Sequence, residues 1–230
     1  MDQAPKIVLS LLALVISVIF HEQMHARVAF WLGDPTGKND NRLSWNPIHH
    51  IDPFMTLLLP MLLYFSTKGQ FMYGGAKPVQ ISALNFRNPS LGMCLSAAAG
   101  PLSNFFLAGA GFALCAILLS AAPSTVFSHG ELTWNGFFLV YFVFINFLLG
   151  AFNLLPIPPL DGSRILRHFS PRDVQTVIDA VEPFGLFLTM GLVYLGFAQI
   201  LNPVINLYLR ALEHAGGYDF AKAADAVLFR

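Results

Sequence analysis

Long apolar runs alternate with short polar stretches along the chain, and the longest runs match the length of membrane-spanning helices. The first run continues as a helical pattern over residues 7–32, about 26 residues, which suffices to cross a hydrocarbon core of about 30 Å. Gly33 and Pro35 then predict the end of this helix, because glycine suits a C-cap and proline cannot continue a helix. Further helices are predicted over residues 91–121, 134–155 and 183–201.

Two stretches between the first and second helices predict partial elements. Residues 54–65, "FMTLLLPMLLYF", are only 12 long and contain a proline, so we expect a re-entrant or broken half-span. The alternation of Val79 and Ile81 after the Gly74-Gly75 pair predicts a short hairpin or extended strand near the membrane interface.

The last third of the chain is predicted to be less regular. A basic and acidic loop is expected after "LPIPPLDGSR" and before the helix over 183–201. Asn202-Pro203 is expected to break that helix, because proline lacks the backbone N–H that the helix needs. A final mixed segment follows.

Small and polar residues mark one face of two predicted helices. In the helix over 91–121 a ridge of such residues recurs every fourth position, which lets another backbone approach closely in lipid. In the helix over 134–155, Asn146 and Asn153 share a face and should look inward. The ridge consists of Gly92, Ser96, Gly100, Asn104 and Ala108.

Composition supports the same picture. Hydrophobic residues make up 55% of the chain, charged residues only 11%, and the mean hydropathy is +0.60, whereas about a quarter of a soluble domain is charged. Thirteen basic and thirteen acidic residues balance, so no basic field points to a nucleic-acid partner. We predict an all-α membrane protein in the lipid bilayer, a polytopic bundle of about four to six spans that forms one domain over residues 1–230.

Residues 21–25 read HEQMH within the apolar first helix. The spacing places His21 and His25 one turn apart on one face, where two imidazoles can bind one metal ion. Glu22 lies beside that face and can take a proton from a water that the metal activates, as the general base does in zinc hydrolases. Ionisable groups inside a spanning helix are costly and as a rule functional, so a metal site is favoured over a chance match.

A third metal ligand is needed, because zinc usually takes three protein ligands in catalytic sites. The acidic residues of polar loops and termini, Asp34 among them, are explained by solvation. Asp161 instead follows "NLLPIPPL", where prolines break the helix and turn a carboxylate back towards membrane depth. Asp161 could instead be an ordinary turn residue of an Asp-Gly pair. Because HEQMH is also present, a metal ligand is the better interpretation of Asp161.

Three motifs together resemble the site-2 protease family of intramembrane zinc metalloproteases. They are HEQMH, GPLSN at residues 100–104 and NLLPIPPLDG at residues 153–162, and the resemblance extends from the first helix to Arg164. The sequence lacks the PDZ and CBS domains of many relatives and is similar to the compact bacterial branch, in which the loop "GDPTGKNDNRLSWNPIHHIDP" is also typical.

The resemblance implies one zinc ion per chain, held by His21, His25 and Asp161. It implies Glu22 as the catalytic base and Asn153 as a residue that helps to bind the substrate strand. The implied activity is cleavage of a single-span transmembrane protein within the bilayer, as in regulated intramembrane proteolysis. The substrate's identity and the oligomeric state stay open.

Several alternatives remain beside this interpretation. A channel or transporter could use the His/Glu cluster to pass protons or metal, but it predicts polar residues spread along several helices. A non-catalytic helix-binding relative is disfavoured because Glu22 is intact. Asn104 can touch substrate or make a polar packing contact. His49 and His50 tempt a second metal site, but adjacent side chains point apart, which favours a loop or interface role.

Basic residues predict the orientation in the membrane. They flank the ends that carry the metal motif, whereas the loop over 122–133 has none, and Lys/Arg excess marks the cytoplasmic side. We therefore expect a multi-pass protein of the cell membrane with its metal site towards the cytosol. The flanking residues are Lys38, Arg42, Lys68, Lys77, Arg87, Arg164, Arg167 and Arg172.

Overall fold

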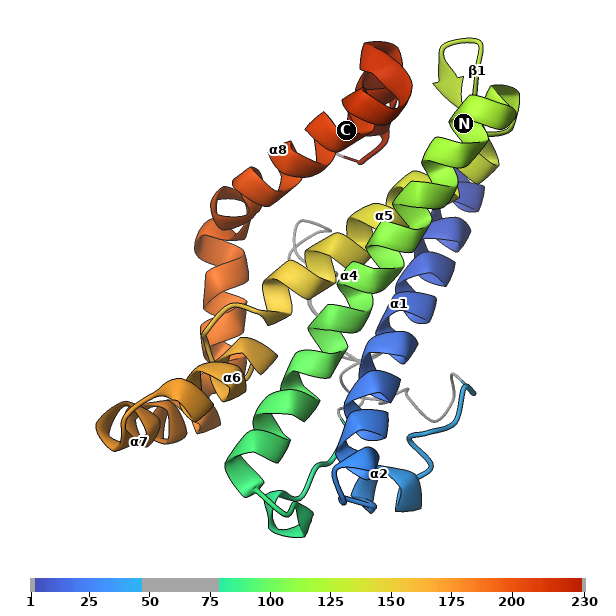
Figure 1. Cartoon of the computed structure of the whole chain (residues 1–230). Coiled ribbons are helices and arrows are strands. Elements are labelled where there is room, and N and C mark those ends of the chain that lie inside the picture. Colours follow the sequence, from blue (N-terminus) through green and yellow to red (C-terminus); the bar gives the residue numbers. More distant parts are fainter. Residues whose placement is uncertain (1–2, 47–78, 229–230) are drawn as a thin grey trace. The chain divides into compact units, whose positions relative to one another are not determined.

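The computed structural model describes residues 3–46 and 79–228, and helices make up nearly all of its regular structure (Figure 1). The expected half-span over 54–65, the Gly74-Gly75 turn and the His49-His50 pair lie outside the described residues. The longer helices are α1 (Gln3–Trp31), α4 (Pro89–Ala121), α5 (Trp134–Asn153), α6 (Asp161–Phe169), α7 (Arg172–Val181) and α8 (Gly185–Leu228). The short elements are α2 (Thr36–Asn39), the 3-10 turns η3 (Ala83–Asn85), η4 (Pro123–Thr125) and η5 (Glu182–Phe184), and the strands β1 (Phe127–Ser128) and β2 (Glu131–Leu132).

Three of the described helices are long and apolar enough to cross a membrane. They cover Ala4–Trp31, Pro89–Ala121 and Trp134–Asn153, and each corresponds to a helix predicted from the sequence. The all-α membrane fold class is thereby confirmed. The only strands in the described part of the chain, β1 and β2, form a two-residue antiparallel pair.

The last third of the chain is more helical than predicted. The expected loop after residue 164 is instead α6 and α7, whose 9 and 10 residues are too few for a periodic pattern to stand out in the sequence. The predicted break at Pro203 is also wrong, since α8 continues through it for a total of 44 residues. A proline inside a helix removes one backbone hydrogen bond but keeps a helical φ, and a helix of this length has many other turns.

The chain divides into two compact units that alternate along the sequence. The first comprises Met1–Ser17, Asn104–Ala151 and Ala198–Arg230. Its core joins α5 to α8, and Tyr208 donates its hydroxyl proton to the Val140 carbonyl at 2.7 Å. A buried tyrosine hydroxyl needs such a partner, so this hydrogen bond fixes how the two helices pack.

The second unit comprises Val18–Ser103 and Phe152–Phe197. It contains the C-terminal half of α1, the start of α4, and the helices α6 and α7. The HEQMH motif, the first four residues of the GPLSN motif and the whole NLLPIPPLDG motif therefore fall in the same unit. This unit positions the residues that the sequence singles out for chemistry.

Candidate metal centre

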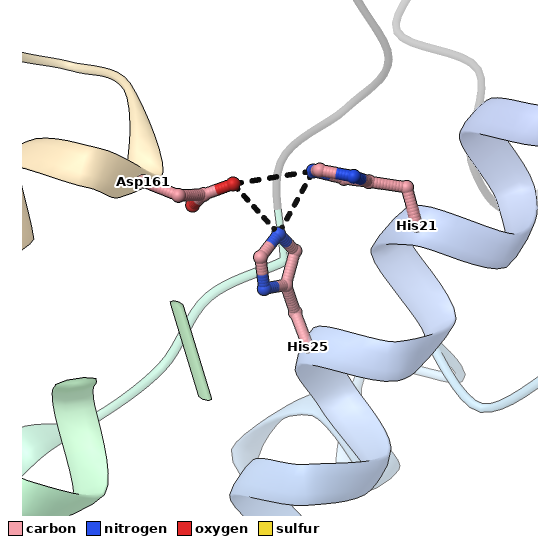
Figure 2. A group of neighbouring side chains, drawn as sticks. All are labelled: His21, His25 and Asp161. Carbon is pink, nitrogen blue, oxygen red and sulfur yellow. Dashed lines mark hydrogen bonds and ion pairs between the residues drawn. The ribbon is translucent and has the colours of Figure 1, made fainter. Parts of the chain in front are cut away.

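Two histidines and one aspartate meet in the second unit, with their side chains pointing at one another (Figure 2). His21 and His25 project from α1 one turn apart, and Asp161 is the first residue of α6. The two Nε2 atoms are 3.0 Å apart. The Asp161 Oδ2 atom lies 3.3 Å from His21 Nε2 and 3.2 Å from His25 Nε2. The structure thus brings together the three residues that the sequence proposes as metal ligands.

The separations fit a tetrahedral zinc site. Zinc bonds of about 2.0–2.1 Å to nitrogen and oxygen place neighbouring ligand atoms roughly 3.3 Å apart in tetrahedral geometry. The three observed separations lie between 3.0 and 3.3 Å. Two imidazole nitrogens and a carboxylate oxygen are also a donor set that zinc accepts. These residues can therefore hold one metal ion.

A backbone carbonyl of α4 fixes the orientation of His25. The Nδ1 atom of His25 lies 2.7 Å from the Ser96 carbonyl oxygen. A carbonyl can only accept a hydrogen bond, so Nδ1 carries the proton. The Nε2 lone pair of the neutral ring then faces the cluster, as a metal ligand requires.

Close approach of α4 to the two imidazoles depends on a glycine. A Cβ atom added at Gly100 would lie 2.3 Å from His25 Nε2 and 2.7 Å from the Cε1 atom of His21. No side chain fits at such distances without displacing the rings. The small-residue ridge predicted from the sequence therefore serves the metal cluster at Gly100, a role that tertiary packing alone reveals.

The turn between α5 and α6 delivers Asp161 to the cluster. The Ser163 N–H and hydroxyl both donate to the Leu160 carbonyl, at 3.0 and 2.7 Å, and start α6 directly after the prolines. Gly162 lies against the end of α5, where an added Cβ would be 2.2 Å from the Leu154 carbonyl oxygen. The glycine after Asp161 thus lets the chain turn tightly enough to point the carboxylate at the histidines.

The surroundings of Asp161 favour its charged form. Its Oδ2 atom faces the Nε2 atoms of His21 and His25, so a cation held among these three atoms stabilises the carboxylate. An ionised carboxylate is the form that binds a metal ion.

Glu22 is half-buried on α1 and contacts the segment that precedes α4. Its Oε2 atom accepts a hydrogen bond from the Val79 backbone N–H at 3.0 Å. The contact places the predicted interfacial strand, of which Val79 and Ile81 are described, beside the residue expected to act as the base. No strand is assigned within residues 79–82.

Asp34 is placed differently from its expected position. The sequence assigns it to a solvated loop, but the residue is completely buried. Its carboxylate accepts hydrogen bonds from the Ser82 N–H at 2.8 Å, the Asn85 amide at 2.7 Å, and the N–H and hydroxyl of Thr36. The loop after α1 is thereby tied to the segment before α4, which sequence neighbours could not indicate.

The asparagines occupy two environments. In the first unit, Asn104 donates to the Asn146 side-chain oxygen at 2.8 Å and to the Ser17 carbonyl at 3.3 Å, and Asn146 donates to the Ser17 hydroxyl at 2.7 Å. The expected inward orientation of Asn146 is confirmed, since it is fully buried. The polar packing contact that the sequence leaves open for Asn104 is present. Asn153, in the second unit, is the last residue of α5 and is half-buried.

Comparison with known proteins identifies relatives. The model of peptidase family M50 matches residues 85–192, which include Asp161. The chain is 35% identical to "Putative zinc metalloprotease YwhC" of Bacillus subtilis over 85% of this chain and 84% of the relative. It is 27% identical to "Putative zinc metalloprotease Rip2" of Mycolicibacterium smegmatis over 87% of this chain and 69% of the relative. It is 30% identical to "Putative zinc metalloprotease MJ0611" of Methanocaldococcus jannaschii over 70% of each. No solved structure matches this chain.

Proposed function

The chain belongs to peptidase family M50, the site-2 protease family of zinc metalloproteases, and on this premise we propose that it cleaves transmembrane helices inside the bilayer. His21, His25 and Asp161 are the proposed ligands of one zinc ion. Glu22 is the proposed general base. The runner-up, a transporter that uses the same cluster for protons or metal, shares the metal site but not the need for a base.

The depth of the cluster is the observation that carries the proposal. His25 lies six residues before the end of α1 at Trp31, or about 9 Å along the helix. Its hydrogen-bond partner Ser96 lies seven residues after the start of α4 at Pro89, or about 10 Å. The cluster therefore lies within the length of both candidate spans, which supports cleavage inside the bilayer.

Zinc, when bound, supplies Lewis acidity to the scissile carbonyl and makes water a better nucleophile. Glu22 takes the proton of the attacking water while a C–O bond forms at the scissile carbon. Glu22 then gives the proton to the leaving nitrogen as the C–N bond breaks. The Asn153 amide, at the end of α5, is proposed to hydrogen-bond the substrate strand, and Asn104 is retained as a second candidate for that contact.

The substrate must expose its backbone before it can be cut. A transmembrane helix hides its carbonyls in internal hydrogen bonds, and each group left unsatisfied in lipid costs several kcal/mol. We propose single-span substrates whose helix is already weakened by Gly, Pro or Asn. The segment that begins at Val79 is the proposed edge along which the unwound strand pairs.

The proposed orientation places the cluster towards the cytosol of a cell membrane, because Lys and Arg flank that end of the spans. The loop with β1 and β2 would then face outside. A cysteine introduced at the exposed Glu131 should react with an impermeant reagent added to intact cells, and reaction only after lysis contradicts this orientation.

Replacement of the base tests the proposed function. Glu22→Gln keeps the size of the side chain but removes the proton acceptor, and loss of a general base typically costs about 10²–10⁴ in rate. Purified wild-type and variant protein are compared for zinc content and for cleavage of a panel of single-span helices. We expect equal zinc content and loss of cleavage in the variant.

Two outcomes contradict the proposal. Unchanged cleavage by Glu22→Gln excludes the assigned base. A wild-type protein that binds zinc, cuts none of the helices and moves protons or metal across vesicle membranes supports the transporter instead.

A further inference from the structure

Helix α7 carries an apolar stripe that stays exposed among the described residues. Val174, Val177, Ile178 and Val181 follow the i, i+3, i+4, i+7 spacing that puts side chains on one face of a helix. Arg172, Gln175, Thr176 and Asp179 lie on the opposite side of α7, whereas Asp173 borders the stripe. None of the residues of α7 is buried, and Val177 is 62% exposed. In a soluble protein, a surface helix packs such a stripe against the protein core.

Helix α6 adds to this apolar surface. Leu166 and Phe169 stand three positions apart and are both exposed, Phe169 at 77%. The charged side of α6 faces α7 instead. The Arg167 guanidinium donates two hydrogen bonds to the Asp179 carboxylate, at 2.7 and 2.9 Å. Arg167 and Asp179 thus pair between the two helices, and the apolar side chains remain exposed.

The second unit fixes the depth of this α6–α7 hairpin. The first residue of α6, Asp161, contacts His25, about 9 Å inside the end of the α1 span. Near the other end, His168 hydrogen-bonds with Ser90, the second residue of the α4 span, at 2.7 Å. Helix α6 therefore runs from inside the membrane-crossing length to the point where α4 begins. The hairpin is thus held at the level of the first turns of the candidate α4 span.

We propose that the α6–α7 hairpin is an interfacial membrane anchor, with Val174, Val177 and Phe169 inserted among the lipid headgroups and upper acyl chains. Amphipathic helices with an apolar stripe bury it about 5–10 Å into this layer. The inference goes beyond the proposed protease function and rests only on the membrane assignment and on the contacts of the hairpin.

The observations favour lipid over another protein as the occupant of the apolar stripe. The hairpin is held at the interface by Asp161 and Ser90, so lipid is in contact range at all times, whereas a protein partner must diffuse to it. The charge of Arg167 is matched by Asp179, so this arginine does not need an anionic lipid as its partner. Because Asp161 begins the hairpin, insertion of the stripe also sets the depth of the proposed third ligand.

Fluorescence quenching by brominated lipid tests the inference on the intact protein. Val177→Cys and Arg172→Cys place a bimane label on opposite sides of α7, and both positions are exposed. Each labelled protein is reconstituted in phosphatidylcholine vesicles with and without bromine on the acyl chains. The unsubstituted protein, whose Cys94 and Cys115 are buried, corrects for background labelling. We expect roughly threefold or stronger quenching at 177 relative to 172.

Two results overturn the inference. Equal, weak quenching at both positions means that the stripe faces water. Shielding at 177 that does not respond to brominated lipid and falls when the protein is diluted in lipid means that a second copy covers the stripe. If Val177→Cys does not fold, Val174→Cys supplies a second position on the same face.

Discussion

Asp34 and Asp161 are two carboxylates in the same unit, both shielded from solvent, but their partners differ. The Asp34 carboxylate accepts hydrogen bonds from an amide side chain, a hydroxyl and two backbone N–H groups. Asp161 faces the Nε2 atoms of His21 and His25. The groups that face Asp34 donate hydrogen bonds to it, whereas an imidazole nitrogen can instead give its lone pair to a metal. Burial alone therefore does not identify a carboxylate as a metal ligand. Neighbouring groups whose lone pairs can bind the same ion do.

Removing each carboxylate in turn tests most directly whether Asp161, but not Asp34, binds zinc. Asp161→Ala should lower the zinc content of the purified protein at least tenfold, because two histidines leave the ion short of its usual three protein ligands. Asp34→Asn should leave the zinc content near one per chain. Metal analysis of both variants beside the wild type measures the difference. Full zinc content in Asp161→Ala would show that the two carboxylates do not differ as proposed.

The packing of α4 on the histidines offers a second, somewhat smaller effect. Gly100→Ala places a methyl group against His25, so we expect the rings to move and the zinc affinity to fall about 10- to 100-fold, as for other supporting residues of metal sites. Zinc titration in the presence of a competing chelator measures the change. Gly109→Ala is the matched control on the same helix, since an added Cβ there meets nothing within 4 Å. Equal affinities in the two variants would exclude the packing role.

The smallest expected effect concerns acid stability at Asp34. Burial raises the pKa of Asp34, but hydrogen bonds from Asn85, Thr36 and Ser82 outweigh it and hold the pKa below its usual value. A lowered folded-state pKa gives stability that is fully present above the unfolded pKa of about 3.9 and is lost as the pH falls through the folded pKa. Asp34→Asn should therefore unfold more easily than wild type by about 1–3 kcal/mol at neutral pH.

The difference in the free energy of unfolding between Asp34→Asn and wild type should narrow below about pH 4. There protonation removes the charge that only the wild type carries. Denaturant unfolding of both proteins in detergent at several pH values measures this difference. Asp40→Asn, in the same loop but exposed, should show no comparable gap. A gap that stays constant down to pH 2 would mean that Asp34 acts by shape and not by charge.

The sequence predicts most of what hydropathy and local spacing control. The three candidate spans follow from apolar length, and the meeting of His21 with His25 follows from helical periodicity. The contact with Asp161 is predicted only because zinc chemistry demands a third ligand. Each of these predictions needs only the residues of one segment or one rule of metal coordination.

What the sequence does not predict depends on tertiary partners. The burial of Asp34 is invisible because its donors Ser82 and Asn85 lie some fifty positions away. Helix α7 is missed because ten residues between Pro171 and Glu182 give too short a stripe to distinguish from a charged loop. The continuation through Pro203 is missed because local propensity is weaker than the packing of a long helix.

The hydrogen bond between His25 and the Ser96 carbonyl has a consequence for how this site tolerates genetic change. The orienting atom belongs to the main chain, so every amino acid at position 96 supplies it, and no side-chain replacement there can delete it directly. A carboxylate in the same role could be lost by one substitution. The tautomer of His25 is thus protected against point mutation at its own partner, and its vulnerability shifts to residues such as Gly100 that control how closely α4 approaches.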